Sequence, residues 1–184
     1  DVLILTKALG TGTLFAADMQ QKAKGRWIEG ALKSMVQSNR KAAQCLFNHG
    51  ASACTDITGF GLVGHTVEMT KASGVDVEID LDSLPVLDGA QETVGIGILS
   101  SLQPANVRLR RAIRNLNEAR EHERYPLIFD PQTSGGLLAS LPAERAQSCL
   151  RALRDLGYAK AAIVGRVAAK SDHLEPVTLI SQPN

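Results

Sequence analysis

The sequence has few of the features that mark metal-bound, disulfide-rich, membrane or nucleic-acid-binding proteins. Its three cysteines, Cys45, Cys54 and Cys149, are widely spaced without a Cys-x-x-Cys pair, so neither a structural zinc site nor a disulfide framework is indicated. The 20 basic and 19 acidic residues give a net charge of +1, which argues against binding nucleic acid or membrane by charge. No apolar run reaches membrane-spanning length, and the first residues lack a secretory pattern. A reducing, cytoplasmic setting is therefore expected.

What the sequence does contain is enough apolar residues for one substantial core. Its 184 residues suit a single domain, and the abrupt start on an apolar strand indicates a piece of a longer protein. Apolar periodicity predicts a mixed α and β (α+β) fold, with helices layered on one central sheet. The strands are predicted at residues 2–6, 51–57, 75–80, 137–141, 161–164 and 176–180. The helices are predicted near residues 28–36, 39–50, 60–69, 91–98, 107–116 and 142–157.

The same patterns assign side chains to core or solvent. The helices place these large side chains toward the core: Ile28, Leu32, Met35, Val36, Phe47 and Leu156. The acids that alternate along residues 75–80 are expected on a wet face, and Lys7 is expected to be solvated in a loop over residues 7–12. Residues 100–106 are predicted as a polar loop. The arginines of the next helix are expected to form a solvated flank: Arg108, Arg110, Arg111, Arg114 and Arg120.

Residues 53–65, with the sequence ACTDITGFGLVGH, place an acid, hydroxyls and glycines in a turn between a strand and a helix. Glycines let a backbone approach a ligand, and the first free N–H groups of a helix suit a phosphate. Asp56 could then hold the Mg²⁺ that accompanies polyphosphates. The alternative is structural: the glycines allow a tight crossing, Asp56 caps the helix, and His65 packs inside it. Spacing alone leaves both readings open, because Gly-x-Gly-x-x-Gly is a weak signal by itself.

A second polar loop, with the sequence DPQTSGG at residues 130–136, precedes the strand at 137–141. Pro131 excludes a regular helix there, and the hydroxyls and free amides of the loop can wrap an anion. A purely structural turn between two strands is the alternative.

Three stretches together resemble the C-terminal half of selenophosphate synthetase (selenide, water dikinase), in the wider aminoimidazole ribonucleotide synthetase-like superfamily. They are LTKALGTG at residues 5–12, TDITGFGLVGH at 55–65 and DPQTSGGLL at 130–138, and they bracket most of the chain. The resemblance implies that residues 1–184 form one C-terminal domain and that the N-terminal ATP-binding and catalytic domain is absent. Ala8 departs from the usual Lys-Pro-Leu-Gly, and Ser-Leu-Gln-Pro replaces the glycines common in the loop before Asn106.

The resemblance also implies the chemistry of the whole enzyme. It would be an ATP-dependent phosphotransferase, a homodimer that makes selenophosphate from selenide, ATP and water, with Mg²⁺, releasing AMP and phosphate. The family carries its reactive cysteine or selenocysteine, with its lysine, in the N-terminal domain. No catalytic residue is therefore expected here, and the piece alone should be inactive.

A short set of site residues carries over. Asp56 matches the aspartate that reaches a metal on the ATP phosphates across the domain cleft. The others are expected to form the phosphate side of that cleft: Thr55, Thr58, Gly59, Gly61, Gln132, Thr133 and Ser134. His65 is expected to be structural.

Two other functions stay open. The chain could be an interaction or dimerisation module, which an apolar patch of interface size around Asp56 and Thr133 would favour over a polar cleft. It could also belong to a related ATP-dependent enzyme of purine biosynthesis, which would share the MgATP chemistry and differ in the acceptor.

Overall fold

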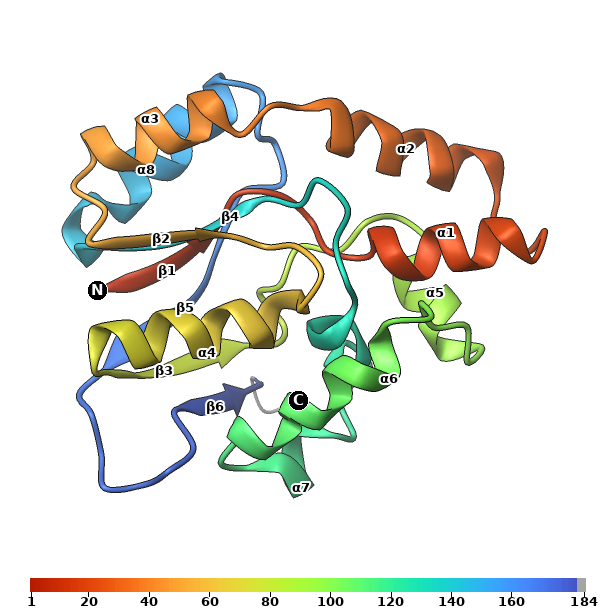
Figure 1. Cartoon of the computed structure of the whole chain (residues 1–184). Coiled ribbons are helices and arrows are strands. Elements are labelled where there is room, and N and C mark those ends of the chain that lie inside the picture. The colour runs from red at the N-terminus through yellow and green to blue at the C-terminus, as the bar shows by residue number, and fades with distance from the viewer. Residues whose placement is uncertain (182–184) are drawn as a thin grey trace.

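The computed structural model describes residues 1–181, which form one six-stranded mixed sheet with helices on both faces (Figure 1). The strands lie in the order β2-β4-β1-β5-β3-β6, and every neighbouring pair is antiparallel except β3 with β6. Their bounds are β1 Val2–Leu5, β2 Ala53–Asp56, β3 Asp76–Asp80, β4 Leu137–Leu141, β5 Ala162–Ala168 and β6 Val177–Ile180. The predicted mixed fold and all six predicted strands are confirmed.

The helices vary widely in length. The longer ones are α1 Thr11–Met19, α2 Gly25–Val36, α3 Arg40–Asn48, α4 Gly61–Ser73 and α8 Ala143–Asp155. The shorter ones are α5 Ala90–Gly95, α6 Gln103–Asn106, α7 Leu116–Ala119 and the 3₁₀ helices η1 Val107–Ala112 and η2 Tyr125–Phe129. Among residues 1–181 no helix is long and apolar enough to cross a membrane.

The central strand β1 is apolar along its whole length because helices cover both faces of the sheet. Successive side chains of a strand point to opposite faces. Leu3 and Leu5 accordingly lie in the core beneath α4, whereas Ile4 lies in the core beneath α3 and α8. Figure 1 shows α3 and α8 on one side of the strands and α4 on the other.

A third, smaller core lies beyond the end of β1, where α1, α2 and α5 meet. Trp27 and Ala31 of α2 are buried there with Leu14 of α1. The predicted apolar face of α2 is only partly right, because Ile28 packs against this core whereas Leu32 and Val36 are exposed. The helix packs against α1 and not against the sheet, so the side chains one position away face inward.

Other sequence predictions also need correction. Phe47 and Leu156 are exposed, not core-facing. The predicted loop over residues 7–12 gives way to α1 at Thr11, and the predicted loop over 100–106 contains α6. The long helix predicted over 107–116 is the 3₁₀ helix η1 followed by an extended Ile113, whose isolated bridge to Val177 ties it to the edge of the sheet.

Asp76, the first residue of β3, is buried and not on a wet face as the alternation predicted. It is 3% exposed, and its carboxylate accepts hydrogen bonds from Arg114 Nη2 at 2.9 Å, Lys170 Nζ at 2.9 Å and Ser171 N at 3.0 Å. Burial raises the pKa of this carboxyl, but the hydrogen bonds from Ser171, Lys170 and Arg114 outweigh it and hold the pKa well below its usual range. Arg114 therefore leaves the predicted solvated flank, while Arg108 and the other arginines stay exposed.

Candidate functional site

Strand β2 ends at the exposed Asp56, and the turn after it starts α4 against a neighbouring loop. Gly61 has a φ of +69°, and a Cβ there would lie 2.9 Å from the carbonyl carbon of Phe129. A side chain would be strained and would clash, so glycine is required for α4 to pack on η2. Because Gly61, Leu62 and Val63 are buried, the first turn of α4 is closed by this packing, and the structural role predicted for the glycine applies here.

The loop at 130–136 lies directly beside that turn. Ile57 N–H donates to Gly136 O at 2.8 Å, and Gln132 N–H donates to Thr58 O at 3.0 Å. A Cβ on Gly135 would lie 2.1 Å from Ile57 O, so this glycine permits the close approach. Two stretches that are far apart in sequence thus form one surface.

The side chain of Gln132 ties in the third stretch, at the start of α1. Its Oε1 accepts from Gly10 N–H at 3.0 Å, from Thr11 N–H at 3.2 Å and from Thr11 Oγ1 at 3.2 Å. Thr11 Oγ1 in turn accepts from Thr133 N–H at 2.9 Å. Gln132 is 4% exposed, so it organises the loops from inside and does not face a cleft as predicted.

Asp130 is a buried acid in the same network, and no separate role was predicted for it. Its Oδ2 accepts from Gly12 N–H at 3.0 Å and from Gln132 Nε2 at 2.9 Å. Burial raises the pKa of Asp130 to about 7, although hydrogen bonds from Gln132 and the N–H groups of Gly12 and Thr13 pull it downward. A Cβ on Gly12 would lie 2.6 Å from Asp130 Oδ1, which explains the glycine.

Lys7 is buried, so the prediction that it is solvated is wrong. Only 3% of the residue is exposed, and its Nζ donates to Gln37 O at 2.6 Å and Ser134 O at 3.0 Å. Burial lowers the pKa of this lysine. Ser134, which supplies one acceptor, has a left-handed φ of +49°, a conformation that costs free energy for a non-glycine residue.

Asn106 closes the network from the side of α6. Its Nδ2 donates to Gly59 O at 2.7 Å and to Phe129 O at 3.0 Å, so one amide holds both the turn before α4 and the end of η2. His65 is buried in α4 as predicted, with Nε2 3.1 Å from Thr58 Oγ1 and Nδ1 3.1 Å from Glu68 Oε2.

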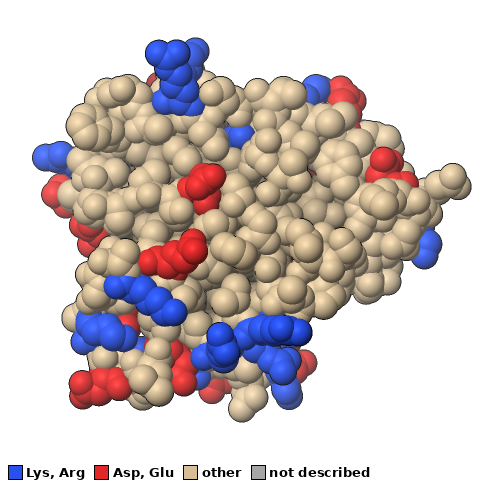
Figure 2. All heavy atoms as spheres, in the orientation of Figure 1, with Lys and Arg blue, Asp and Glu red and all other residues tan. Residues whose placement is uncertain are grey.

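The network leaves a defined set of groups at the surface. Asp56, Gly59, Thr133 and Ser134 are exposed, and Thr55 and Thr58 are partly so. Among residues 1–181 the Asp56 carboxylate makes no hydrogen bond or ion pair, so it is not a helix cap. Figure 2 shows acidic side chains in the middle of this face, over β2 and α4, with Lys and Arg gathered along the edge near η1 and α7.

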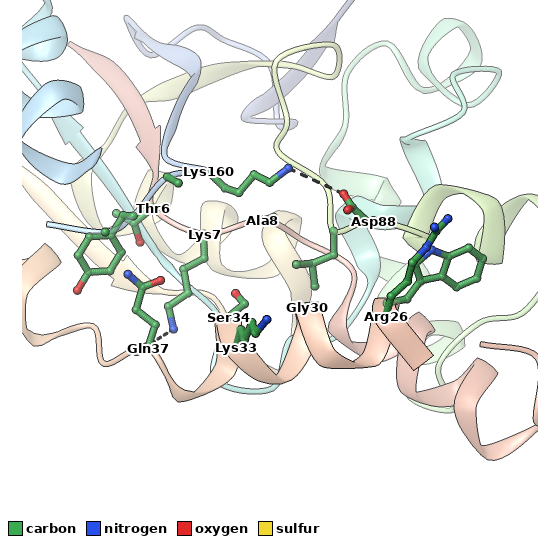
Figure 3. A pocket seen from close by; sticks show the side chains of 15 residues that line it. Thr6, Lys7, Ala8, Arg26, Gly30, Lys33, Ser34, Gln37, Asp88 and Lys160 are labelled. Atoms are coloured by element: carbon green, nitrogen blue, oxygen red, sulfur yellow. Dashed lines mark hydrogen bonds and ion pairs between the residues drawn. The ribbon is translucent and has the colours of Figure 1, made fainter. Parts of the chain in front are cut away.

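A hollow of about 490 Å³ lies on the other side of Lys7, between α2 and the loops at 87–88 and 157–160. Arg26 and Lys33 line it from α2, and Lys160 reaches across it to within 3.9 Å of Asp88 (Figure 3). Figure 3 also shows the Lys7 ammonium turned toward Gln37, in line with its hydrogen bond to that carbonyl. The inner cation is thus already engaged, and at the rim Lys33 is paired with Glu29 and Lys160 with Asp88.

The site can therefore supply one unpaired carboxylate and a row of hydroxyl and backbone groups. Mg²⁺ on a polyphosphate takes one or two protein carboxylates together with phosphate oxygens and water. Asp56 fits one such ligand. Two other carboxylates belong to the network, but Asp130 is buried and Glu68 is engaged by His65.

The sequence and the fold assign the chain to a known protein family. The sequence matches the family described as AIR synthase related protein, C-terminal domain, over residues 1–174, and the chain belongs to that family. Solved structures share the fold: HypE, a hydrogenase maturation protein of E. coli, superposes with a TM-score of 0.67 at 20% identity, covering 97% of this chain and 45% of HypE. AaThiL, complexed with AMPPCP and TMP, superposes with a TM-score of 0.57 at 20% identity, covering 97% and 47%.

Sequence relatives narrow the class further. Selenide, water dikinase of Caldanaerobacter subterraneus subsp. tengcongensis is 39% identical over 173 residues, which are 94% of this chain and 50% of the relative. Selenide, water dikinase 2 of Peptoclostridium acidaminophilum is 38% identical over 175 residues, 94% of this chain and 49% of the relative. The chain thus spans about half the length of these curated relatives.

Proposed function

We propose that residues 1–184 act as the C-terminal half of a selenide, water dikinase and supply one wall of its MgATP site. The reactive cysteine or selenocysteine and the remaining metal ligands would come from an N-terminal domain. In this proposal the complete enzyme is a cytoplasmic homodimer that uses Mg²⁺, and this half contributes no catalytic residue of its own.

The observation that carries the proposal is the state of Asp56. Its carboxylate is exposed and makes no hydrogen bond or ion pair among residues 1–181, while the loops around it are fixed by hydrogen bonds of the buried residues Gln132, Asn106 and Lys7. A rigid support beneath an uncompensated charge is what a metal ligand requires. The reaction in the proposal is taken from the relatives, which are named selenide, water dikinase.

A second feature supports a neighbouring domain. Thr133 lines a hollow of about 380 Å³ together with Leu99, Leu102 and Met19, and all three of these apolar side chains are exposed. Exposed apolar side chains that gather beside a polar loop suit contact with protein. The interaction role kept open above and the MgATP role are therefore compatible, since the same face would meet the other domain at Thr133 and the nucleotide at Asp56.

The test is Asp56→Asn in the full-length enzyme, with ATP turnover measured across Mg²⁺ concentrations. Loss of a metal ligand should lower turnover by about tenfold or more at low Mg²⁺, with the fold intact. Asp155→Asn is the matched control, because Asp155 is an exposed aspartate at the end of α8 and does not belong to the loops around Asp56. Equal turnover by both variants at every Mg²⁺ concentration would remove Asp56 from the site.

A further inference from the structure

Two of the three cysteines, far apart in sequence, meet on the face of the sheet opposite α4. Cys45 lies on α3 and Cys149 on α8, which pack against each other over β4 and β1 (Figure 1). Both thiols are buried. His49 follows Cys45 by one helical turn, so both side chains lie on the same face of the helix.

The three side chains bring their ligand atoms together. One atom each from Cys45, His49 and Cys149 lies within 4.8 Å of the other two, and Cys45 Sγ is 3.7 Å from His49 Nδ1. For zinc bonds of about 2.3 Å to sulfur and about 2.0 Å to nitrogen, a tetrahedral site places sulfur and nitrogen about 3.5 Å apart. The observed spacing is within reach of that geometry by small side-chain rotations.

The charge balance favours a divalent ion. Two thiolates and a neutral imidazole neutralise a 2+ ion, so the occupied site would bury no net charge, whereas a monovalent ion would leave one negative charge in the core. Thiolate and imidazole are ligands that zinc-like ions prefer, and they are poor ligands for Mg²⁺. The site would therefore not compete for the ion of the MgATP site.

Without a metal, burial favours the protonated form of the two thiols. Burial raises the pKa of Cys149 to about 12, with a further contribution from Cys45, and burial likewise raises the pKa of Cys45. His49 Nδ1 lies 2.8 Å from Cys45 O, which it contacts as a donor when it carries the proton. Metal binding would release both thiol protons and move the imidazole proton to Nε2.

We propose that Cys45, His49 and Cys149 form a binding site for a divalent, thiol-seeking cation of the zinc class, which joins α3 to α8. Among residues 1–181 these three are the ones that meet as metal-ligating groups, so water or an external ligand would take the fourth position. His49 is partly exposed and gives the ion its entry from solvent. The proposal goes beyond the MgATP function and does not depend on it.

The test uses Co²⁺ as a spectroscopic probe of the reduced chain, with Zn²⁺ as competitor. The proposal predicts one Co²⁺ per chain, an intense thiolate-to-cobalt absorption band and displacement by an equivalent of Zn²⁺. Cys45→Ala and Cys149→Ala should lose the band. His49→Gln, at a partly exposed position that leaves the core intact, should keep a thiolate band but bind at least about 100-fold more weakly, since even outer-sphere partners account for 10- to 100-fold.

Matched controls separate the site from the rest of the chain. Cys54→Ala removes the one exposed cysteine on β2, and His173→Gln changes an exposed histidine; both should bind Co²⁺ like the parent. The absence of a thiolate band in the reduced, folded parent would overturn the proposal. So would a band that disappears with Cys54→Ala, or an affinity that His49→Gln leaves unchanged.

Discussion

Two aspartates near opposite edges of the sheet have opposite environments. Asp76 lies on β3, next to the edge strand β6, and is buried with Arg114, Lys170 and Ser171 around its carboxylate. Asp56 lies at the end of β2, the other edge strand, and is exposed with no partner among the described residues. One charge is compensated within the chain, whereas the other is left for something outside it.

The difference separates structural acids from candidate ligands. Asp76 ties Arg114, which follows η1, and residues 170–171, which lie between β5 and β6, to β3, so its role lies inside the fold. Asp56 ties down nothing, although Gln132, Asn106 and Lys7 fix the loops around it. Asp56 therefore stands on rigid loops but stabilises no part of its own chain. We expect such a carboxylate to bind a ligand.

An acid with no partner in the core should have the largest effect. Val63→Asp places a charge beneath α4, where Val63 is 0% exposed in an apolar core. We expect a loss of about 4 kcal/mol or more in the free energy of unfolding, because the charge is buried unpaired. Chemical denaturation measures it, with Val36→Asp on the exposed face of α2 as control. A soluble Val63→Asp chain that melts cooperatively near the parent temperature would contradict the assignment of this helix face.

Removing the compensated charge should have the next largest effect. Asp76→Asn leaves Arg114 and Lys170 without their carboxylate, and we expect a loss of about 2 kcal/mol. The value is below that of a fully buried pair because both cations are partly exposed. Denaturant midpoints compare this variant with Asp155→Asn, which should stay within about 0.5 kcal/mol of the parent. Equal denaturant midpoints for the two variants would show that Asp76 contributes no more to stability than an exposed aspartate.

The pH dependence of stability should show Asp76 and Asp130 with opposite signs. The contribution of Asp76 is present above its unfolded pKa of about 3.9 and is lost as the pH falls below it toward the lower folded pKa. Asp130 has a raised folded pKa of about 7, so its contribution is lost as the pH rises from about 4 to about 7.

The Asp130→Asn variant isolates the contribution of Asp130 to the pH dependence of stability. The stability difference between parent and variant should shift by about 1 kcal/mol or more in favour of the variant between pH 4 and pH 8, since one pKa unit corresponds to about 1.4 kcal/mol. Melting curves across this pH range measure it. A constant difference would mean that Asp130 ionises normally inside the loop network.

The smallest effect on stability should come from the uncompensated charge. Asp56→Asn removes no hydrogen bond or ion pair among residues 1–181, so the free energy of unfolding should change by less than about 0.5 kcal/mol. The same melting experiment compares it with Asp76→Asn. A loss of unfolding free energy similar to that of Asp76→Asn would show that Asp56 has a structural role. It would also remove the contrast between the two aspartates.

The sequence predicted those features that depend on neighbouring residues. The apolar run of β1, the strand and turn that lead to α4, and the buried position of His65 follow from local periodicity and turn chemistry. The resemblance to selenophosphate synthetase found the three stretches, although it did not show that they touch. Their contact depends on hydrogen bonds such as Thr11 to Gln132, which link residues 121 positions apart.

The failures at buried polar side chains share one physical cause. Lys7 resembles a loop lysine until the fold brings up the carbonyls of Gln37 and Ser134, which are 30 and 127 residues away. Asp76 likewise looks exposed by alternation until Lys170 arrives from 94 residues away. A polar side chain can be buried when distant partners satisfy it, and a local pattern contains no information about them. For the same reason, a search for Cys-x-x-Cys spacing could not predict that Cys45 and Cys149 lie close together.

We propose that Asp56 belongs to a site that this chain does not complete alone. Calorimetric titration of MgATP into the chain, and then into the chain together with the complementary N-terminal half, tests it most directly. We predict heat of binding only when both halves are present, and weaker binding when the chain carries Asp56→Asn. Tight binding of MgATP to residues 1–184 alone would contradict the account, because the phosphate contacts would then lie entirely within the loops described above.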